Sequence, residues 1–68
     1  MTKGKLILKD GDFVKATWSD GLVVIGIYRR EERGYLILED HLSNEVPCNK
    51  STVSFEAMSE EKGLELFK

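Results

Sequence analysis

The sequence is short of the residues that usually reinforce a small domain. Its 68 residues include one cysteine, Cys48, one histidine, His41, and one proline. A single cysteine excludes an intramolecular disulfide, and one cysteine with one histidine excludes a Cys-rich zinc site. A domain of this size buries only about 60% of the surface that its unfolded chain exposes. Self-association is therefore the expected source of extra burial, and we expect a homo-oligomer.

Long apolar runs and a strong charge of either sign are also missing. We expect no membrane anchor and no secretory signal, because no apolar run approaches membrane-spanning length. The unpaired cysteine favours a reducing, cytoplasmic location. The net charge of −2 and the 41% hydrophobic content are typical of a globular protein. This charge argues against indiscriminate binding to nucleic-acid backbones, which needs many lysine and arginine contacts.

The sequence also lacks the patterns that accompany catalysis. Cys48 falls in an expected strand and alternates inward, where a free cysteine usually behaves as a small apolar residue. His41 lies in an expected loop with no third group to complete a catalytic set. Adjacent acidic pairs such as Glu31-Glu32 would point to opposite faces of a strand. With no phosphate-binding glycine loop and no metal-ligand cluster, we predict no enzyme, no metal and no cofactor.

Short segments of alternating polarity fill most of the chain. In residues 13–18, Val14, Ala16 and Trp18 share one face, which is typical of a half-buried strand. The following Asp20-Gly21 pair tolerates the positive φ angles of a tight turn. By the same reasoning we expect five or six strands, at 13–18, 22–28, 35–39, 45–48 and 52–57, with 5–9 as the candidate for a sixth. In residues 35–39, Leu36 and Leu38 are expected to face inward and Ile37 outward, and in residues 52–57 the inward residues are expected to be Val53, Phe55 and Ala57.

Several single residues refine this pattern. Residues 22–28 are apolar on both faces, so the strand should be central or bent, with Gly26 at the bend. Residues 29–34 are interpreted as a polar hairpin connection. Pro47 removes one ladder donor and predicts that residues 45–48 form an edge strand.

The end of the chain predicts a short helix or tail. Ser59 could cap a helix whose first turn carries acidic residues. Leu64 and Phe67 are spaced to pack such a helix onto the barrel or onto a neighbour. Gly63 should weaken it, because glycine is a poor helix former.

These elements predict a small, strongly bent, all-β five-stranded barrel of the Sm-like or SH3-like type. We expect one domain over residues 1–68, with a barrel core at about 11–57 and a C-terminal helix or tail at 58–68. The length, and the absence of a helix between the third and fourth strands, disfavour an OB-fold.

The quoted turns and strands carry a family resemblance. Asp20-Gly21, Gly26 and Leu36-Ile37-Leu38-Glu39-Asp40 follow the order of the first Sm motif, and residues 46–55 match the second. Residues 11–57 thus resemble the Sm-like (LSm/Hfq-type) family, in a minimal form similar to phage or metagenomic members. The resemblance implies a ring in which the fourth strand of one protomer pairs with the fifth strand of the next. It implies interface residues Val46, Cys48, Val53 and Phe55.

The sequence departs from the family where RNA is bound. Glu32 and Tyr35 occupy places where family members have an Asp and an Asn that help to bind a base. Asn49-Lys50 stands where the family usually has an Arg-Gly pair. The resemblance therefore implies the fold and the ring more firmly than it implies binding of uridine-rich RNA.

A nucleic-acid site is still a reasonable expectation. Guanidinium groups mixed with an aromatic ring suit single-stranded nucleic acid, whose bases stack and whose phosphates attract arginine. In a ring, the Asn49-Lys50 turn would join the 29–35 hairpin near the pore, with Tyr35 stacking on bases and Lys50 contacting phosphate. The candidate residues are Arg29, Arg30, Arg33, Tyr35, Asn49 and Lys50. A solvated hairpin whose Arg and Glu side chains neutralise each other is the structural alternative.

Two further functions remain open. One is an SH3- or Tudor-like protein-interaction module, with Trp18, Tyr28 and Tyr35 lining a peptide groove and no ring required. The other is a structural or adaptor ring of a phage that binds no nucleic acid. The acidic pI of about 5.3 favours these two over RNA binding.

Overall fold

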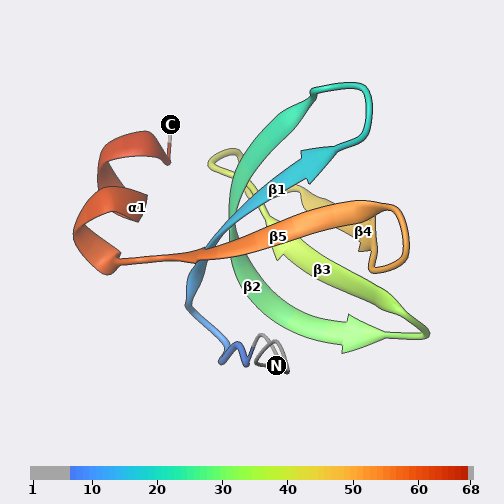
Figure 1. The fold of residues 1–68 in the computed structure, drawn as a ribbon. Coiled ribbons are helices and arrows are strands. Elements are labelled where there is room, and N and C mark those ends of the chain that lie inside the picture. The colour runs from blue at the N-terminus through green and yellow to red at the C-terminus, as the bar shows by residue number, and fades with distance from the viewer. Residues whose placement is uncertain (1–6, 68) are drawn as a thin grey trace, which may run out of the picture.

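The computed structural model describes residues 7–67 and shows a curved antiparallel sheet followed by a short helix (Figure 1). The elements are β1 (Phe13–Trp18), β2 (Val23–Glu32), β3 (Tyr35–Glu39), β4 (Glu45–Asn49), β5 (Val53–Met58) and α1 (Glu60–Leu66). The strands lie in the order β4-β3-β2-β1-β5 in one five-stranded sheet. The predicted small all-β fold with a C-terminal helix is confirmed. Residues 7–9 of the strand expected at 5–9 are not in a strand, and residues 5 and 6 lie outside the described chain.

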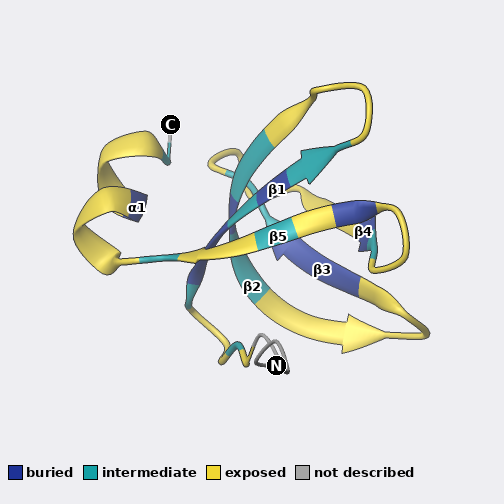
Figure 2. Ribbon diagram, in the orientation of Figure 1, coloured by how far each residue is buried: buried dark blue, intermediate teal, exposed yellow. Residues whose placement is uncertain are grey.

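The core lies on the concave face of this sheet (Figure 2). Alternation along each strand brings the buried side chains together, as the sequence predicts for most of them. The cluster consists of Val14, Ala16, Leu36, Leu38, Cys48 and Val53. Trp18 and Phe55 are partly buried against it. Ala57 was expected to face inward into the core but is exposed, although Val53 on the same side of β5 is buried.

β2 contains a change of register three residues after its glycine. The pairing of β2 with β3 shifts between Tyr28 and Arg30, which marks a β-bulge. The bulge therefore does not lie at Gly26, where the sequence predicts a bend. Gly26 instead allows close packing, since a Cβ there would lie 3.0 Å from Cβ of Leu38 and 3.2 Å from the carbonyl oxygen of Glu39.

The β2–β3 connection is much shorter than the sequence suggested. β2 continues to Glu32, and the turn consists of Arg33 and Gly34, with φ of 51° and 83°. Two consecutive residues of positive φ form the type I′ turn that suits a tight hairpin. The interpretation of residues 29–34 as a loop is therefore wrong for residues 29–32, so Arg29 and Arg30 lie within a strand and not at a hairpin tip.

α1 is tied to the convex face of the sheet at one point. The Ser59 hydroxyl accepts a hydrogen bond from the Lys62 N–H at 3.2 Å, so the predicted N-cap is confirmed. Gly63 is buried against Phe13, and the Phe67 ring lies edge-on to Phe13 with centroids 5.5 Å apart. The packing predicted for Phe67 is therefore confirmed. Leu64 is 59% exposed, so it does not pack onto the barrel, and its packing onto a neighbour stays a prediction.

Candidate functional site

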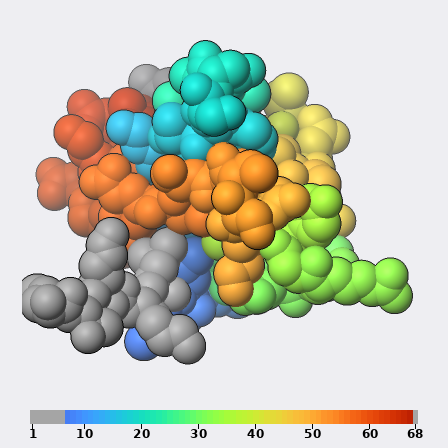
Figure 3. Space-filling view, turned by 45° about the vertical axis from the view of Figure 1, so that its right-hand side comes forward, coloured from blue at the N-terminus to red at the C-terminus, as the bar shows by residue number. Residues whose placement is uncertain are grey.

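The structure brings four of the six predicted nucleic-acid residues to one end of the sheet. Tyr35 pairs directly with Asn49, and the Lys50 N–H donates to the Gly34 carbonyl at 3.0 Å. The β2–β3 and β4–β5 turns therefore lie side by side. We call Arg33, Tyr35, Asn49 and Lys50 the tip cluster. The β2–β3 hairpin that carries its first half projects from the body of the molecule (Figure 3).

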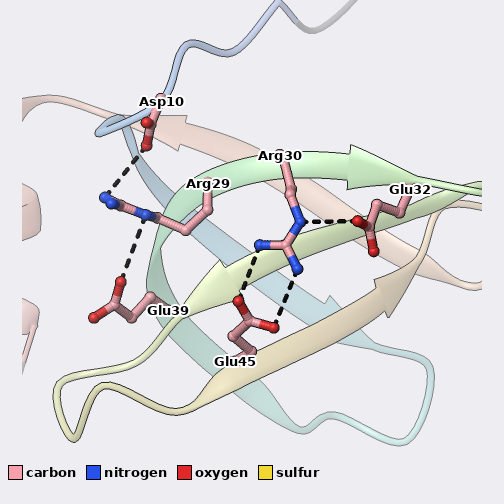
Figure 4. A network of polar contacts seen from close by, with 6 residues as sticks. All are labelled: Asp10, Arg29, Arg30, Glu32, Glu39 and Glu45. Carbon is pink, nitrogen blue, oxygen red and sulfur yellow. Dashed lines mark hydrogen bonds and ion pairs between the residues drawn. The ribbon is translucent and has the colours of Figure 1, made fainter.

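The other two predicted residues belong to a separate network of ion pairs along β2 (Figure 4). Arg29 lies 3.2 Å from Asp10 and 3.5 Å from Glu39. Arg30 donates two hydrogen bonds to Glu45, of 2.9 and 3.2 Å, and a third of 3.0 Å to Glu32. These bonds raise the pKa of Arg30 and lower the pKa of the Glu45 carboxyl. Both guanidinium groups are thus already engaged by carboxylates.

The Arg30 network has a packing role as well. Ile37 is only 6% exposed although it lies on the convex face, between Arg30 and Pro47 on the neighbouring strands. The ion pair from Arg30 to Glu45 spans β3, and Arg30 is the residue of β2 that pairs with Ile37. Long charged side chains cover apolar surface with their stems, so this pair shields Ile37 from water.

Within the tip cluster, two of the four side chains are also occupied. Lys50 Nζ lies 2.8 Å from a Glu31 carboxylate oxygen, and Asn49 Oδ1 accepts a hydrogen bond from the Ser51 N–H at 2.8 Å. Asn49 therefore shapes its own turn. Arg33 has no ion-pair partner within residues 7–67, and Tyr35 is 42% exposed. The cluster offers a ligand one arginine and one aromatic ring.

The tip cluster does not form one continuous concave surface. Tyr35 and Asn49 share the convex face, because directly paired residues point to the same side. Lys50 and Glu31 instead stand at the rim of a shallow groove of about 530 Å³ at the mouth of the barrel. We call it the mouth groove, and it is lined by Ile7, Leu8, Tyr28, Glu31, Leu36, Lys50 and Phe55. Its floor is apolar and its rim carries the ion pair.

The aromatic side chains do not build the peptide groove of the SH3-like alternative. Tyr28 lines the mouth groove on the concave side, and Tyr35 lies on the convex side. Trp18 is packed against the core and does not line the mouth groove. The three rings therefore do not face one common surface.

The sheet ends on one side in β5, whose outer backbone groups have no partner among residues 7–67. The Trp18 N–H donates to Leu22 and the Tyr28 N–H donates to Asp12, so alternate residues of β1 bond to β2. The intervening residues of β1 bond to β5 through Ser54, Glu56 and Met58. The backbone groups that point away from the sheet belong to Val53, Phe55 and Ala57, which we call the β5 row.

On its other side the sheet ends in β4, where the same reasoning applies. The Lys50 N–H donates to Gly34 and the Asp40 N–H donates to Asn44, so the even-numbered residues of β4 bond to β3. Glu45, Pro47 and Asn49 point their backbone groups outward and form the β4 row. Pro47 thus sits where its missing N–H costs no bond within the sheet. The sequence prediction that this strand lies at an edge is confirmed.

The four predicted interface side chains face the core of their own chain. Cys48 is fully buried and Val53 is 5% exposed, while Val46 and Phe55 are partly buried against the same cluster. An interface at these strands would therefore use backbone groups. On β4 those groups belong to Glu45, Pro47 and Asn49, the sequence neighbours of Val46 and Cys48. Pro47 was the residue from which the sequence indicated that this edge is open.

Cys48 and His41 are not placed as a catalytic pair. Burial raises the pKa of the Cys48 thiol to about 11, and its Sγ donates to the Val46 carbonyl at 3.5 Å. The thiolate needed for attack is therefore disfavoured at neutral pH. His41 is exposed and packs edge-on against Phe67, with ring centroids 6.5 Å apart.

The part of the chain that the structure describes has no group of three His, Cys, Asp or Glu side chains arranged to hold a metal ion. It also has no helix that is both long enough and apolar enough to span a bilayer. Comparison with known proteins gives no match to a family model, to a curated protein or to a solved structure.

Proposed function

We propose that this chain is a non-catalytic assembly module that joins copies of itself through the edges of its sheet. The observation that carries the proposal is the pair of backbone rows on β4 and β5, which find no partner within residues 7–67. An open edge strand is a ready template for another strand. The described core has only eight buried hydrophobic residues, so a second source of burial would add substantially to stability.

Two arrangements would satisfy these edges. Pairing β4 of one copy with β5 of the next is head-to-tail and closes into a ring, as the Sm-like resemblance implies. Pairing like edges about a two-fold axis gives a dimer instead. Either arrangement makes the protein a scaffold that presents several tip clusters at once, and effective concentration then strengthens a weak contact at each of them.

The native mass of the protein tests this proposal. Light scattering and native mass spectrometry over a dilution series should give a mass above that of one chain, falling toward it only at the lowest concentrations. A single-chain mass at every concentration would overturn self-assembly. It would favour a solitary protein-interaction module instead.

Weak binding of single-stranded RNA at the tip cluster is the second candidate function. The supporting observation is that Arg33 and Tyr35 are both exposed, with no carboxylate partner for Arg33 in the described chain. An arginine beside an exposed ring suits a phosphate beside a stacked base. The remaining arginines and Lys50 would have to leave their carboxylates first, so the affinity should be low.

RNA binding at the tip cluster should depend on Arg33, which has no carboxylate partner in the described chain, more than on Arg29, which has two. With an oligouridylate probe at low salt, we expect Arg33→Ala to weaken binding and Arg29→Ala to leave it nearly unchanged. Glu31→Gln should strengthen binding, because it releases Lys50 from its ion pair. Absence of binding by the intact protein at low salt would remove RNA from the proposal without affecting self-assembly.

A further inference from the structure

We infer that the β5 row is the primary self-association surface and that it pairs antiparallel with the β5 row of a second copy about a two-fold axis. This rests on the proposed self-assembly and names the edge that carries it. β5 crosses the middle of one exposed face, shown in orange in Figure 3. The choice of β5 over β4 follows from three properties of the two rows.

The first property is the supply of backbone hydrogen bonds. Val53, Phe55 and Ala57 each offer an N–H and a carbonyl, so two β5 rows can pair without a gap. The β4 row lacks a donor at its centre, because Pro47 has no N–H. Proline and charge on an edge strand are the devices by which proteins blunt that edge, and Glu45 supplies the charge at this one.

The second property is the face on which the side chains of each row lie. Residues that exchange hydrogen bonds across an antiparallel pair point to the same face. The β5 row carries Val53 and Phe55 on the concave, apolar side of the sheet. Two β5 rows therefore join the concave face of one copy to the concave face of the other. A β4 row paired with a β5 row would instead place Glu45 and Pro47 next to this apolar face.

The third property is the match between opposed side chains. A two-fold axis at Phe55 places this ring opposite the partner's Phe55, next to the mouth groove that Phe55 lines. Aromatic pairs across strands are favourable. The same register sets Ser54 opposite the partner's Glu56, so the two Glu56 carboxylates do not oppose each other directly. Val53 then faces the partner's Ala57, a large residue against a small one.

A pair of proline variants tests this inference. Ala57→Pro removes an N–H of the β5 row that makes no bond within the sheet, and Glu45→Pro does the same for the β4 row. Ala57→Ser is the control for the first variant. We expect a dimeric wild type, a dimeric Glu45→Pro variant and a monomeric Ala57→Pro variant, with circular dichroism checking the fold of each.

An oxidative cross-link decides the matter if Ala57→Pro fails to fold. In the double variant Ser54→Cys with Glu56→Cys, each cysteine faces its counterpart across the two-fold axis. Oxidation should give a covalent dimer in high yield, and Glu56→Cys alone should give much less.

The outcomes of these experiments distinguish the two-fold pairing of β5 rows from the more general proposal of self-assembly. An assembly larger than a dimer that both proline variants break would be a β4–β5 ring, which overturns the two-fold pairing and supports self-assembly. A dimer that survives Ala57→Pro and does not cross-link would overturn the inference in favour of another surface. A monomeric wild type at all concentrations would overturn both.

Discussion

Gly63 and Phe13 show how one residue without a side chain positions a whole element. A Cβ built at Gly63 would lie 2.5 Å from Cβ of Phe13 and closer still to its Cγ. The Cβ of Phe13 is fixed by the β1 backbone and cannot swing aside, so a change of ring rotamer alone does not relieve the contact. Glycine at this position therefore stabilises the fold, because the close approach of α1 to the sheet that it allows outweighs its poor helix propensity.

We predict that Gly63→Ala destabilises the protein by roughly 1–2 kcal/mol. The overpacking against Phe13 costs about 1–3 kcal/mol, and the better helix propensity of alanine returns up to about 1 kcal/mol. Urea unfolding measures the difference. In a Phe13→Gly background, which removes the Cβ of residue 13 as well as its ring, the clash is gone, so Gly63→Ala should become neutral or stabilising. An equal loss in both backgrounds would show that Phe13 is not the cause.

Alternation along the sequence predicts most of the core residue by residue. It identifies Val14, Ala16, Leu36 and Leu38 correctly. It fails for Ala57 and Ile37, whose burial depends on what lies beside them. Ala57 lies at the end of β5 nearest α1 and is exposed, whereas Val53 at the other end is buried. Ile37 pairs with Arg30, whose ion pair with Glu45 joins side chains 15 residues apart. Neither circumstance leaves a local pattern.

At the scale of elements, strand existence is predictable and strand length is not. The polar run after Tyr28 looks like a loop, because it consists of arginine and glutamate. In the folded chain these residues extend β2 to Glu32, and Arg29 and Arg30 form ion pairs with Glu39 and Glu45 on the other strands. The partners of these pairs come from β3, β4 and the segment before β1, so only tertiary structure reveals them. This is why two of the six predicted nucleic-acid residues lie outside the tip cluster.

The helix is the element most dependent on a single cap. α1 has only seven residues, too few for a helix that is stable in isolation. We predict that Ser59→Ala costs about 1 kcal/mol by removing the acceptor for the Lys62 N–H. Ser59→Asp should retain most of the stability, since its carboxylate can accept the same bond near the helix N-terminus. Equal destabilisation by both changes, measured by urea unfolding, would contradict a capping role.

For the whole molecule, the sequence predicts the sheet and one surface on which to search for function. Strand periodicity and turn chemistry carry the fold, and the tip cluster does bring Arg33, Tyr35, Asn49 and Lys50 together. The sequence does not reveal that most of the candidate cations are neutralised, nor which backbone rows stay open. Both depend on strand register, which fixes the partner of every side chain and every N–H.

The acid sensitivity of the molecule follows from two of its carboxyl groups. Hydrogen bonds from the backbone N–H groups of Asn44 and Leu42 lower the pKa of Asp40, and Arg30 lowers that of Glu45. Their folded pKa values lie below the unfolded values of about 4. Their contribution to stability is therefore complete above the unfolded pKa and is lost as the pH falls through the folded pKa.

We therefore predict that the urea midpoint falls as the pH is lowered from 5 toward 2 or 3, about the range over which these carboxylates titrate. Asp40→Asn keeps an oxygen that can accept both N–H bonds but removes the titration. This variant should lose less stability in acid than the wild type does. Because self-association adds to apparent stability, both proteins must be compared at one concentration. An identical acid slope in the two proteins would show that Asp40 does not contribute.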